Sequence, residues 1–169
     1  ILAVCGISMM SVNAAEPTDQ ILIGLITKTE VNPFFVKMRQ TAAAVAEKHG
    51  AKLIARFGKF DGDNEGQVAA IENMISAGVK GILITPSNDD VGPALKDARA
   101  KGILVISLDT PLSDADAQDM TFATDNFEAG LLIGKWAKAQ LGDKAAEAKI
   151  AMLDINKDNI SVDVLRDTG

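Results

Sequence analysis

The chain has little of the chemistry that most enzymes use. Its 169 residues include one histidine and one cysteine. A zinc site needs several such ligands, and a Ser-His or Cys-His nucleophile pair needs a histidine beside the nucleophile. No glycine-rich phosphate loop follows the first apolar run, which holds only Gly24. His49 falls at the end of a predicted helix, a structural position. We therefore expect no catalytic residue, no metal and no cofactor in this sequence.

Positive charge is also scarce. The 17 Lys and Arg residues face 23 Asp and Glu residues, which gives a formal net charge of −6 and a pI near 4.8. Nucleic acids and anionic membranes attract clustered positive charge, so neither is expected as a partner. A neutral or cationic small molecule, or a protein, suits this balance. Hydrophobic residues make up 47% of the chain, enough for a buried core.

The first fourteen residues carry no charge and end on Val12-Asn13-Ala14. Such an apolar stretch with small or tolerated residues before the cut is typical of an export signal, so we predict a partial signal peptide over residues 1–14, cleaved near Ala14. A membrane-spanning helix is the alternative, but it needs about 20 apolar residues and Glu16 comes too early. Cys5 lies inside this segment, and a lipoprotein anchor at Cys5 is a second alternative.

Apolar runs alternate with segments of helical period along the rest of the chain. Strands are predicted over 21–26, 51–57, 81–85, 103–108, 121–123 and 149–153. Helices are predicted over 33–49, 64–77, 87–101 and 125–141. This alternation specifies an α/β fold with a doubly wound parallel sheet. On the last helix, Trp136 shares a face with Leu132 and Ile133, which predicts a core position.

Two of these helices begin with a capping-box pattern, Asn64 with Gln67 and Asp125 with Glu128. The turn before the first of them reads Asp-x-Asp-x-Glu-Gly over residues 61–66, which is close to a calcium-binding loop. A strand precedes this turn where a calcium loop needs a helix. We therefore interpret residues 61–66 as a helix-capping turn, with a calcium site as the alternative.

Polar residues follow the predicted strands at the edge where an open α/β sheet binds its ligands. A sugar needs flat aromatic surface together with polar groups that hydrogen-bond in pairs. Residues of these types are Lys28, Asn32, Phe34, Phe35 and Asp109. On the residues alone a second interpretation stays open, in which Phe35 is part of the core and Asp109 caps a turn before Pro111.

Five short motifs in register give this chain a family resemblance. They are Asn32-Pro33-Phe34-Phe35, Gly81 to Pro86, Leu108-Asp109-Thr110, Thr124-Asp125-Asn126, and Ser161 with Arg166. From about Gln20 onward the chain resembles the sugar-binding proteins of bacterial ABC importers of the ribose-binding type, which have the type I periplasmic binding fold. The resemblance implies ligand contacts from Lys28, Asn32, Phe34, Phe35, Thr85, Asp109, Thr110 and Arg166.

Two positions depart from the ribose-binding pattern. Ribose binders place an arginine where this chain has Thr110, and a small hydroxyl residue where it has Lys28. The pocket therefore differs from a ribose pocket in detail. The stretch 61–111 and the segment 164–167 resemble the fructose-type binders of the same family, which favours a fructose-like sugar, with another hexose or a pentose as the alternative.

The resemblance also implies two lobes and a mode of action. Residues 15–123 would form the N-terminal sugar-binding lobe and residues 124–169 the start of an incomplete C-terminal lobe. A periplasmic monomer would close on a monosaccharide and deliver it to the membrane permease of an ABC importer. One alternative is the effector domain of a sugar-responsive regulator, although the uncharged leader stands where a basic helix-turn-helix belongs. A doubly wound enzyme using Asp109 and Lys28 is a weaker alternative.

Overall fold

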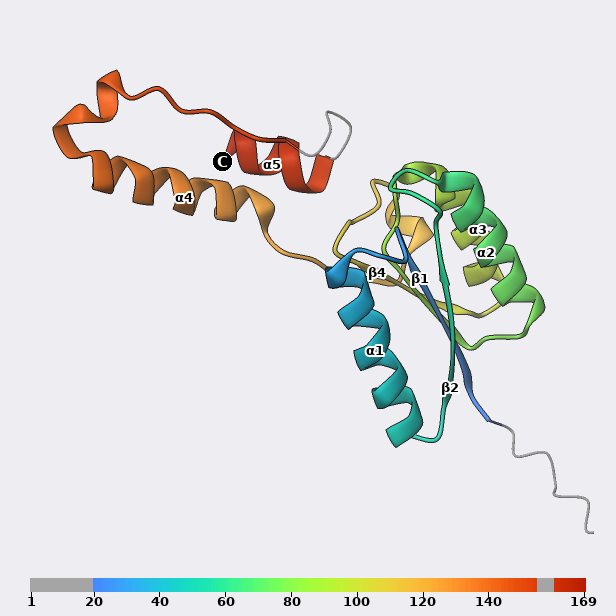
Figure 1. Cartoon of the computed structure of the whole chain (residues 1–169). Helices are drawn as coiled ribbons and strands as arrows, with labels where there is room; N and C mark the ends of the chain where they lie inside the picture. Colours follow the sequence, from blue (N-terminus) through green and yellow to red (C-terminus); the bar gives the residue numbers. More distant parts are fainter. Residues whose placement is uncertain (1–19, 155–159) are drawn as a thin grey trace, which may run out of the picture.

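Five parallel strands form one sheet in the order β2-β1-β3-β4-β5 (Figure 1). The computed structural model describes residues 20–154 and 160–169, so the predicted signal peptide with Cys5 lies outside the described residues. The strands are β1 (Leu22–Thr27), β2 (Lys52–Phe57), β3 (Gly81–Ile84), β4 (Leu104–Leu108) and β5 (Met120–Phe122). All five fall where the apolar runs predicted them, within one or two residues at each end.

Helices cover both faces of this sheet, as the doubly wound prediction requires. One face carries α1 (Pro33–Lys48), and the opposite face carries α2 (Asn64–Ser76) and α3 (Gly92–Ala100) (Figure 1). The short helix η1 (Asp89–Val91) leads directly into α3, and η2 (Ala115–Ala117) lies in the connection from β4 to β5 and packs against α3. Within residues 20–154 and 160–169, none of the helices is long and apolar enough to cross a membrane.

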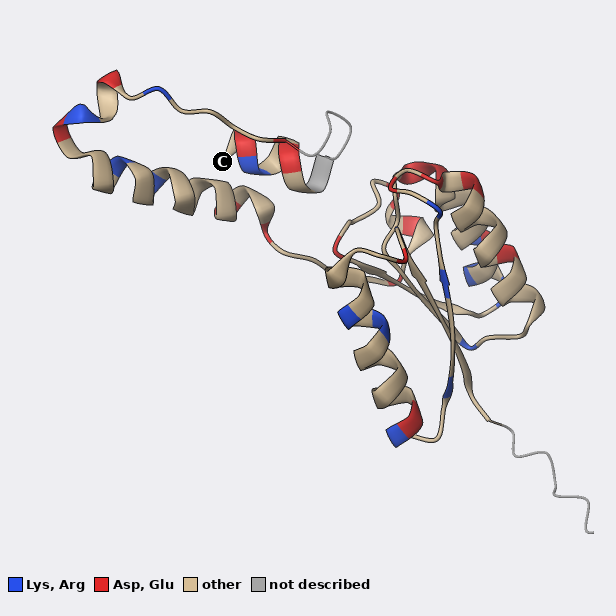
Figure 2. Cartoon of the chain, in the orientation of Figure 1, with Lys and Arg blue, Asp and Glu red and all other residues tan. Residues whose placement is uncertain are grey.

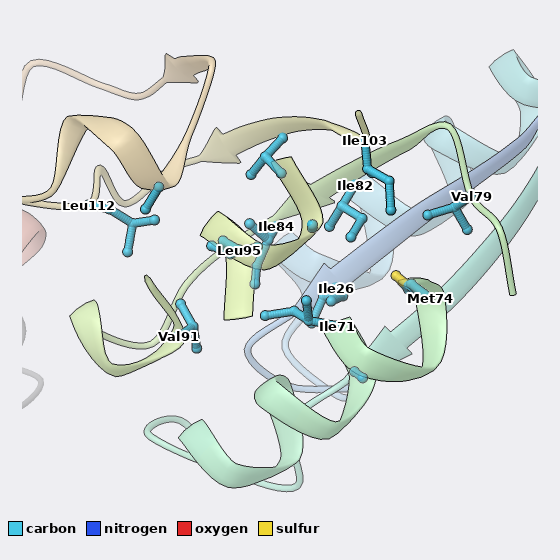
Figure 3. Close-up of a cluster of buried hydrophobic side chains, with 14 residues drawn as sticks. Ile26, Ile71, Met74, Val79, Ile82, Ile84, Val91, Leu95, Ile103 and Leu112 are labelled. Atoms are coloured by element: carbon cyan, nitrogen blue, oxygen red, sulfur yellow. The ribbon is translucent and has the colours of Figure 1, made fainter. Parts of the chain in front are cut away.

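The core lies between the sheet and the helices α2 and α3 (Figure 3). Ile26, Ile82 and Ile84 point from the central strands toward Ile71 of α2 and Leu95 of α3, and all five are at most 1% exposed. Burying a side chain of this size contributes about 1.5–3 kcal/mol. This packing fixes α2 and α3 against β1, β3 and β4, and with them the loops at the carboxyl edge.

Two helix starts differ from the prediction. The cap of α2 is Asp63, whose Oδ1 accepts from Gly66 N at 3.0 Å, whereas Asn64 is already the first helical residue. The capping turn is therefore confirmed, but its predicted cap residue is wrong by one position. The helix predicted from residue 87 begins instead as η1, where Asn88 Oδ1 accepts from Asp90 N at 2.8 Å. Among the described residues no group of acidic or metal-binding side chains is arranged to hold a cation.

The chain beyond β5 forms a separate pair of helices (Figure 1). They are α4 (Asn126–Leu141) and α5 (Leu165–Thr168), with η3 (Gly142–Glu147) and the π-helical turn η4 (Ile160–Val164) between them. The capping box at Asp125 is confirmed in part, because Asp125 Oδ1 accepts from Glu128 N at 2.9 Å. A Cβ added to Gly130 would lie 2.0 Å from the Arg166 carbonyl oxygen, so α4 and α5 meet at backbone distance.

Two further expectations for this segment are wrong. Residues 149–153, predicted as a strand, have no regular secondary structure. A strand needs a partner for its backbone groups, and the described residues offer none beside this segment. Trp136, predicted as core, is 60% exposed. Its neighbours on the same face, Leu132 and Ile133, are 55% and 61% exposed. Their helix, α4, packs on α5 and η3 through its other faces.

Asp119 ties α3 to the sheet and makes stability depend on pH. Its carboxylate accepts from Val105 N at 2.8 Å and from Arg99 Nε and Nη2 at 3.0 and 2.7 Å. The Val105 N–H and the Arg99 guanidinium hold the pKa of Asp119 below its usual range. Because the folded-state pKa is lowered, this stabilisation is complete above the unfolded-state pKa of about 3.9 and is lost as pH falls through the folded-state value.

We therefore expect Asp119→Asn to flatten the fall in unfolding free energy as the pH drops below about 4. Urea unfolding at a series of pH values measures this. Arg99→Met, which leaves the Val105 N–H in place, should flatten the curve only in part. An Asp119→Asn protein with the wild-type slope would contradict this assignment.

Candidate functional site

The order of the strands reverses between β1 and β3, which makes their carboxyl ends the switch point of the sheet. The loop after β1 leads to α1 on one face, and the loop after β3 leads to α3 on the other (Figure 1). Ligands of open α/β sheets bind where two such loops diverge. Two predicted site residues meet here, because Lys28 N donates to Thr85 Oγ1 at 3.0 Å.

Lys28 is the most buried charged residue of this edge, with 3% of its surface exposed. Its ammonium group forms no ion pair or hydrogen bond with any residue in the described ranges. Thr85 is fully buried beside it, and Thr85 N continues the β1 pairing by donating to Ile26 O at 2.8 Å. The Lys28 Nζ is not among the fully buried polar side-chain atoms that lack a partner in the described residues, and it offers a donor to which a ligand oxygen can bind.

The start of α1 presents the aromatic surface. Asn32 Oδ1 accepts from Phe34 N at 3.0 Å and caps the helix, and Pro33 occupies a position that needs no N–H donor. Phe34 is 54% exposed, whereas Phe35 is 4% exposed. Their rings meet edge to face with centroids 5.3 Å apart. Phe34 thus carries the accessible ring, and Phe35 supports it from the core side.

Asp109 has a backbone conformation that side chains rarely adopt. Its φ is +66°, and among the described non-glycine residues it alone has a positive φ. Its N–H donates to Phe122 O at 2.8 Å, and the next residue, Thr110, donates to Leu108 O at 2.7 Å. Its carboxylate accepts no hydrogen bond from the rest of the described chain, so it does not cap a turn before Pro111. Strained residues of this kind are concentrated at binding and catalytic sites.

An open hollow of about 340 Å³ lies against this edge of the sheet. Its walls are Phe34, Met38, Leu108, Asp109, Phe122, Ala123 and Thr124. Apolar rings and one carboxylate therefore face the same space. Two predicted contacts, Phe34 and Asp109, are brought together in this hollow, and Lys28 and Thr85 lie at the neighbouring strand ends.

Arg166 is not brought to this edge. It lies on α5, and its Nε donates to Asn126 Oδ1 on α4 at 2.9 Å. The pair α4 and α5 stands apart from the sheet, across the connection formed by residues 123–125 (Figure 1). Ser161, which the sequence paired with Arg166, has no described side chain.

The loops around the switch point are acidic. Figure 2 shows acidic residues where the chain enters α2 and α3, and the sequence there contains Asp61, Asp63, Glu65, Asp89 and Asp90. The backbone N–H groups of Lys59 and Gly66 hold the pKa of Asp63 below its usual range, so it stays ionised as a helix cap. A negative surface of this kind favours a neutral or cationic ligand over an anion.

A sequence profile of the periplasmic binding protein domain matches residues 23–165. The chain belongs to this periplasmic binding protein family. It is 33% identical to a ribose import binding protein of Haemophilus influenzae over 141 residues, which cover 83% of this chain and 46% of that protein. It is 32% identical to a D-xylose-binding periplasmic protein of Escherichia coli over 129 residues, covering 76% of this chain and 38% of the relative.

A solved structure has the same fold. It is an ABC transporter periplasmic solute-binding protein from Actinobacillus succinogenes with bound D-allose, with a TM-score of 0.66 and 31% identity. The match covers 73% of this chain and 45% of that structure. The chain thus spans less than half the length of the relatives it matches.

One residue that holds the edge was not recognised as such in the sequence of this periplasmic binding protein. Gln67 is fully buried; its Nε2 donates to Thr85 O at 2.9 Å, and its Oε1 accepts from Ser87 N at 2.9 Å. Its spacing from Asn64 predicted a role in a capping box instead. The missed signal is spacing, because Gln67, Ala70, Ile71 and Met74 share the buried face of α2. A polar residue in an apolar stripe indicates a buried hydrogen-bonding role.

We expect Gln67→Leu to lower the unfolding free energy by about 2–4 kcal/mol, because it leaves a buried carbonyl, Thr85 O, and a partly buried N–H, that of Ser87, without partners. Urea unfolding of the full protein measures this. Gln40→Leu, on the exposed side of α1, is the matched control and should stay within about 0.5 kcal/mol of wild type. Equal effects of the two substitutions would show that Gln67 does not hold the loop after β3.

Proposed function

We propose that this chain belongs to the substrate-binding component of a bacterial ABC sugar importer. In this proposal residues 15–123 are the N-terminal sugar-binding lobe and residues 124–169 begin the C-terminal lobe. The observation that carries it is the hollow at the carboxyl edge of the sheet, which is lined by the exposed Phe34 and by Asp109. The Asp109 carboxylate accepts no hydrogen bond within the described residues, and Lys28 lies at the neighbouring end of β1. Relatives named for ribose, xylose and allose support a sugar as the ligand.

Each of these groups matches one part of a monosaccharide. The half-exposed Phe34 ring offers a flat surface for the apolar C–H face of a sugar ring. The Asp109 carboxylate accepts hydroxyl hydrogens, and such charge-assisted hydrogen bonds are among the stronger ones. Lys28 and Asn32 donate to hydroxyl oxygens, and Thr110 adds a hydroxyl group. Thr85, which is fully buried, supports the proposed site through its Oγ1, which accepts from Lys28 N.

We propose a fructose-like hexose as the first candidate, with other hexoses and pentoses next. Ribose-type proteins resemble this chain, but Thr110 and Lys28 replace the groups that the ribose pattern has at these positions. Lys28 adds a long cationic donor at the end of β1, and Thr110 removes a guanidinium beside Asp109. Both changes alter which hydroxyl groups of a sugar can form hydrogen bonds with the proposed site.

Transport in this proposal uses hinge closure and no covalent step. Residues 123–125 between β5 and α4 have no regular secondary structure and are the proposed first crossing between the lobes. Closure would bring Arg166 from the second lobe toward the sugar, and contacts made only in the closed state would stabilise it. The membrane permease would recognise this closed, monomeric protein in the periplasm, after removal of the proposed signal peptide.

The first test is a thermal-shift screen of the full protein against pentoses, hexoses and sugar alcohols. A sugar that binds only the folded state raises stability by about 2.7 kcal/mol at about one hundred times its Kd. We expect one sugar, D-fructose first, to raise the Tm clearly, with 1:1 stoichiometry in calorimetry. A folded protein whose Tm no sugar raises, or one that converts the sugar chemically, would contradict the proposal.

The second test is Asp109→Asn. Asparagine also tolerates a positive φ, so the backbone should keep its conformation, while the loss of a charged acceptor for two hydroxyls should weaken binding about 100-fold or more. Asp109→Ala should abolish binding as well, at an added cost of about 1 kcal/mol in backbone strain. Calorimetry with the sugar found in the screen measures both variants.

Asp97→Asn, an exposed carboxylate on α3, is the matched control for charge and should bind as wild type does. If Asp109→Asn retains near-normal affinity, Asp109 does not contact the sugar.

A further inference from the structure

The loop that joins β1 to α1 is held by side chains. Within the described part of the chain, no hydrogen bond joins the backbone of residues 28–31 to another backbone group. Lys28 N donates to Thr85 Oγ1 at 3.0 Å, and Thr27 Oγ1 donates to Thr29 O at 3.1 Å. The remaining bonds come from one residue of α1. A loop with so few backbone bonds takes its shape from these side chains.

That residue is Arg39, which reaches back over the loop from the second turn of α1. Its Nη1 donates to Thr27 Oγ1 at 3.1 Å and to Thr29 O at 3.0 Å, and its Nη2 donates to Glu30 O. Its guanidinium carbon lies 5.6 Å from the centre of the Phe57 ring at the end of β2. One planar group thus joins the ends of two strands to the loop between β1 and α1.

Two observations separate Arg39 from an ordinary surface charge. It forms no ion pair with a carboxylate among the described residues, so its bonded partners there are all oxygens of residues 27–30. It also does not line the hollow beside Asp109. Its bonds therefore act on the shape of the loop and not on the hollow itself.

We propose that Arg39 is a positioning residue for ligand binding, which fixes residues 28–31 so that Lys28 and Asn32 stand at the site. The inference rests on the proposed function, because it takes this edge as the sugar site. A loop without the guanidinium would hold the binding-competent shape for only a fraction of the time. The apparent Kd rises by the inverse of that fraction.

The experiment compares Arg39→Met and Arg39→Lys with Arg56→Met in the full protein. Arg56 is the matched control, since its Nη1 also donates to a backbone carbonyl, that of Ala55 at 2.8 Å, but away from the loop. Affinity is measured by calorimetry with D-fructose, or with whichever of D-ribose, D-xylose and D-allose binds the wild type. Hydrogen exchange of residues 28–31 is measured without sugar, together with the Tm.

If the loop keeps its shape about one tenth of the time, Arg39→Met raises Kd about tenfold. Exchange at residues 28–31 should then be faster, with a Tm close to that of wild type. Arg39→Lys replaces the fork by a single ammonium and should recover part of the affinity, to within about threefold of wild type. Arg56→Met should bind and exchange as wild type does.

Other results overturn the inference. An Arg39→Met protein with wild-type Kd and exchange shows that the guanidinium does not position the loop. Equal losses of affinity in Arg39→Met and Arg56→Met, in step with their Tm, reduce Arg39 to a general structural role. If no sugar of the thermal-shift screen binds the wild type, the proposed function fails and the binding role of Arg39 with it. Faster hydrogen exchange of residues 28–31 in Arg39→Met would still show that Arg39 holds the loop. Failure of the proposed function can therefore be distinguished from failure of the inference about Arg39.

Discussion

The parallel pairing of β1 with β3 is the contact on which the rest of this chain depends. Residues 23–26 of β1 pair with Gly81–Ile84 of β3, and β2 is left on the other side of β1. Right-handed crossovers then require α1 on one face and α2 and α3 on the other. The two loops that leave the paired strands diverge, and the strand ends place Lys28, Thr85 and, after the next strand, Asp109 at one edge of the sheet.

The helices that make these crossovers also hold the loops in place. Gln67 of α2 bonds to both sides of Pro86 after β3, and Arg39 of α1 bonds to three consecutive loop positions after β1. The two differ in burial, since Gln67 is fully buried and Arg39 is only partly so. Loss of the Gln67 side chain should therefore lower the free energy of unfolding. Loss of the Arg39 side chain should act mainly on the shape of the loop, because water can replace its hydrogen bonds.

Periodicity was enough to predict the sheet and its helices, because burial on one or both faces leaves a pattern in each element. Prediction from periodicity failed where one sequence pattern was compatible with two structures. Asp63 and Asn64 are both residue types that cap helices well, and in the folded turn it is the Asp63 side chain that accepts from Gly66 N. Residues 149–153 are apolar like a strand, but a strand also needs a neighbour. Trp136 lies on an apolar stripe that no described element covers.

Strand ends can be predicted from sequence, so Lys28, Phe34 and Asp109 could be expected at this edge of the sheet, where they lie, and their contact with a ligand stays a prediction. The contacts of Arg39 could not be predicted. Its partners are backbone carbonyls, which any sequence supplies. The hydrogen-bonding groups at this edge of the sheet also bear on which chemical class of ligand would suit it. Lys28 only donates hydrogen bonds, the Asp109 carboxylate only accepts them, and they form no ion pair with each other. A hydroxyl both donates and accepts hydrogen bonds, so the hydroxyl groups of a neutral polyol are chemically suited to either side chain, and its C–H face to the exposed Phe34 ring.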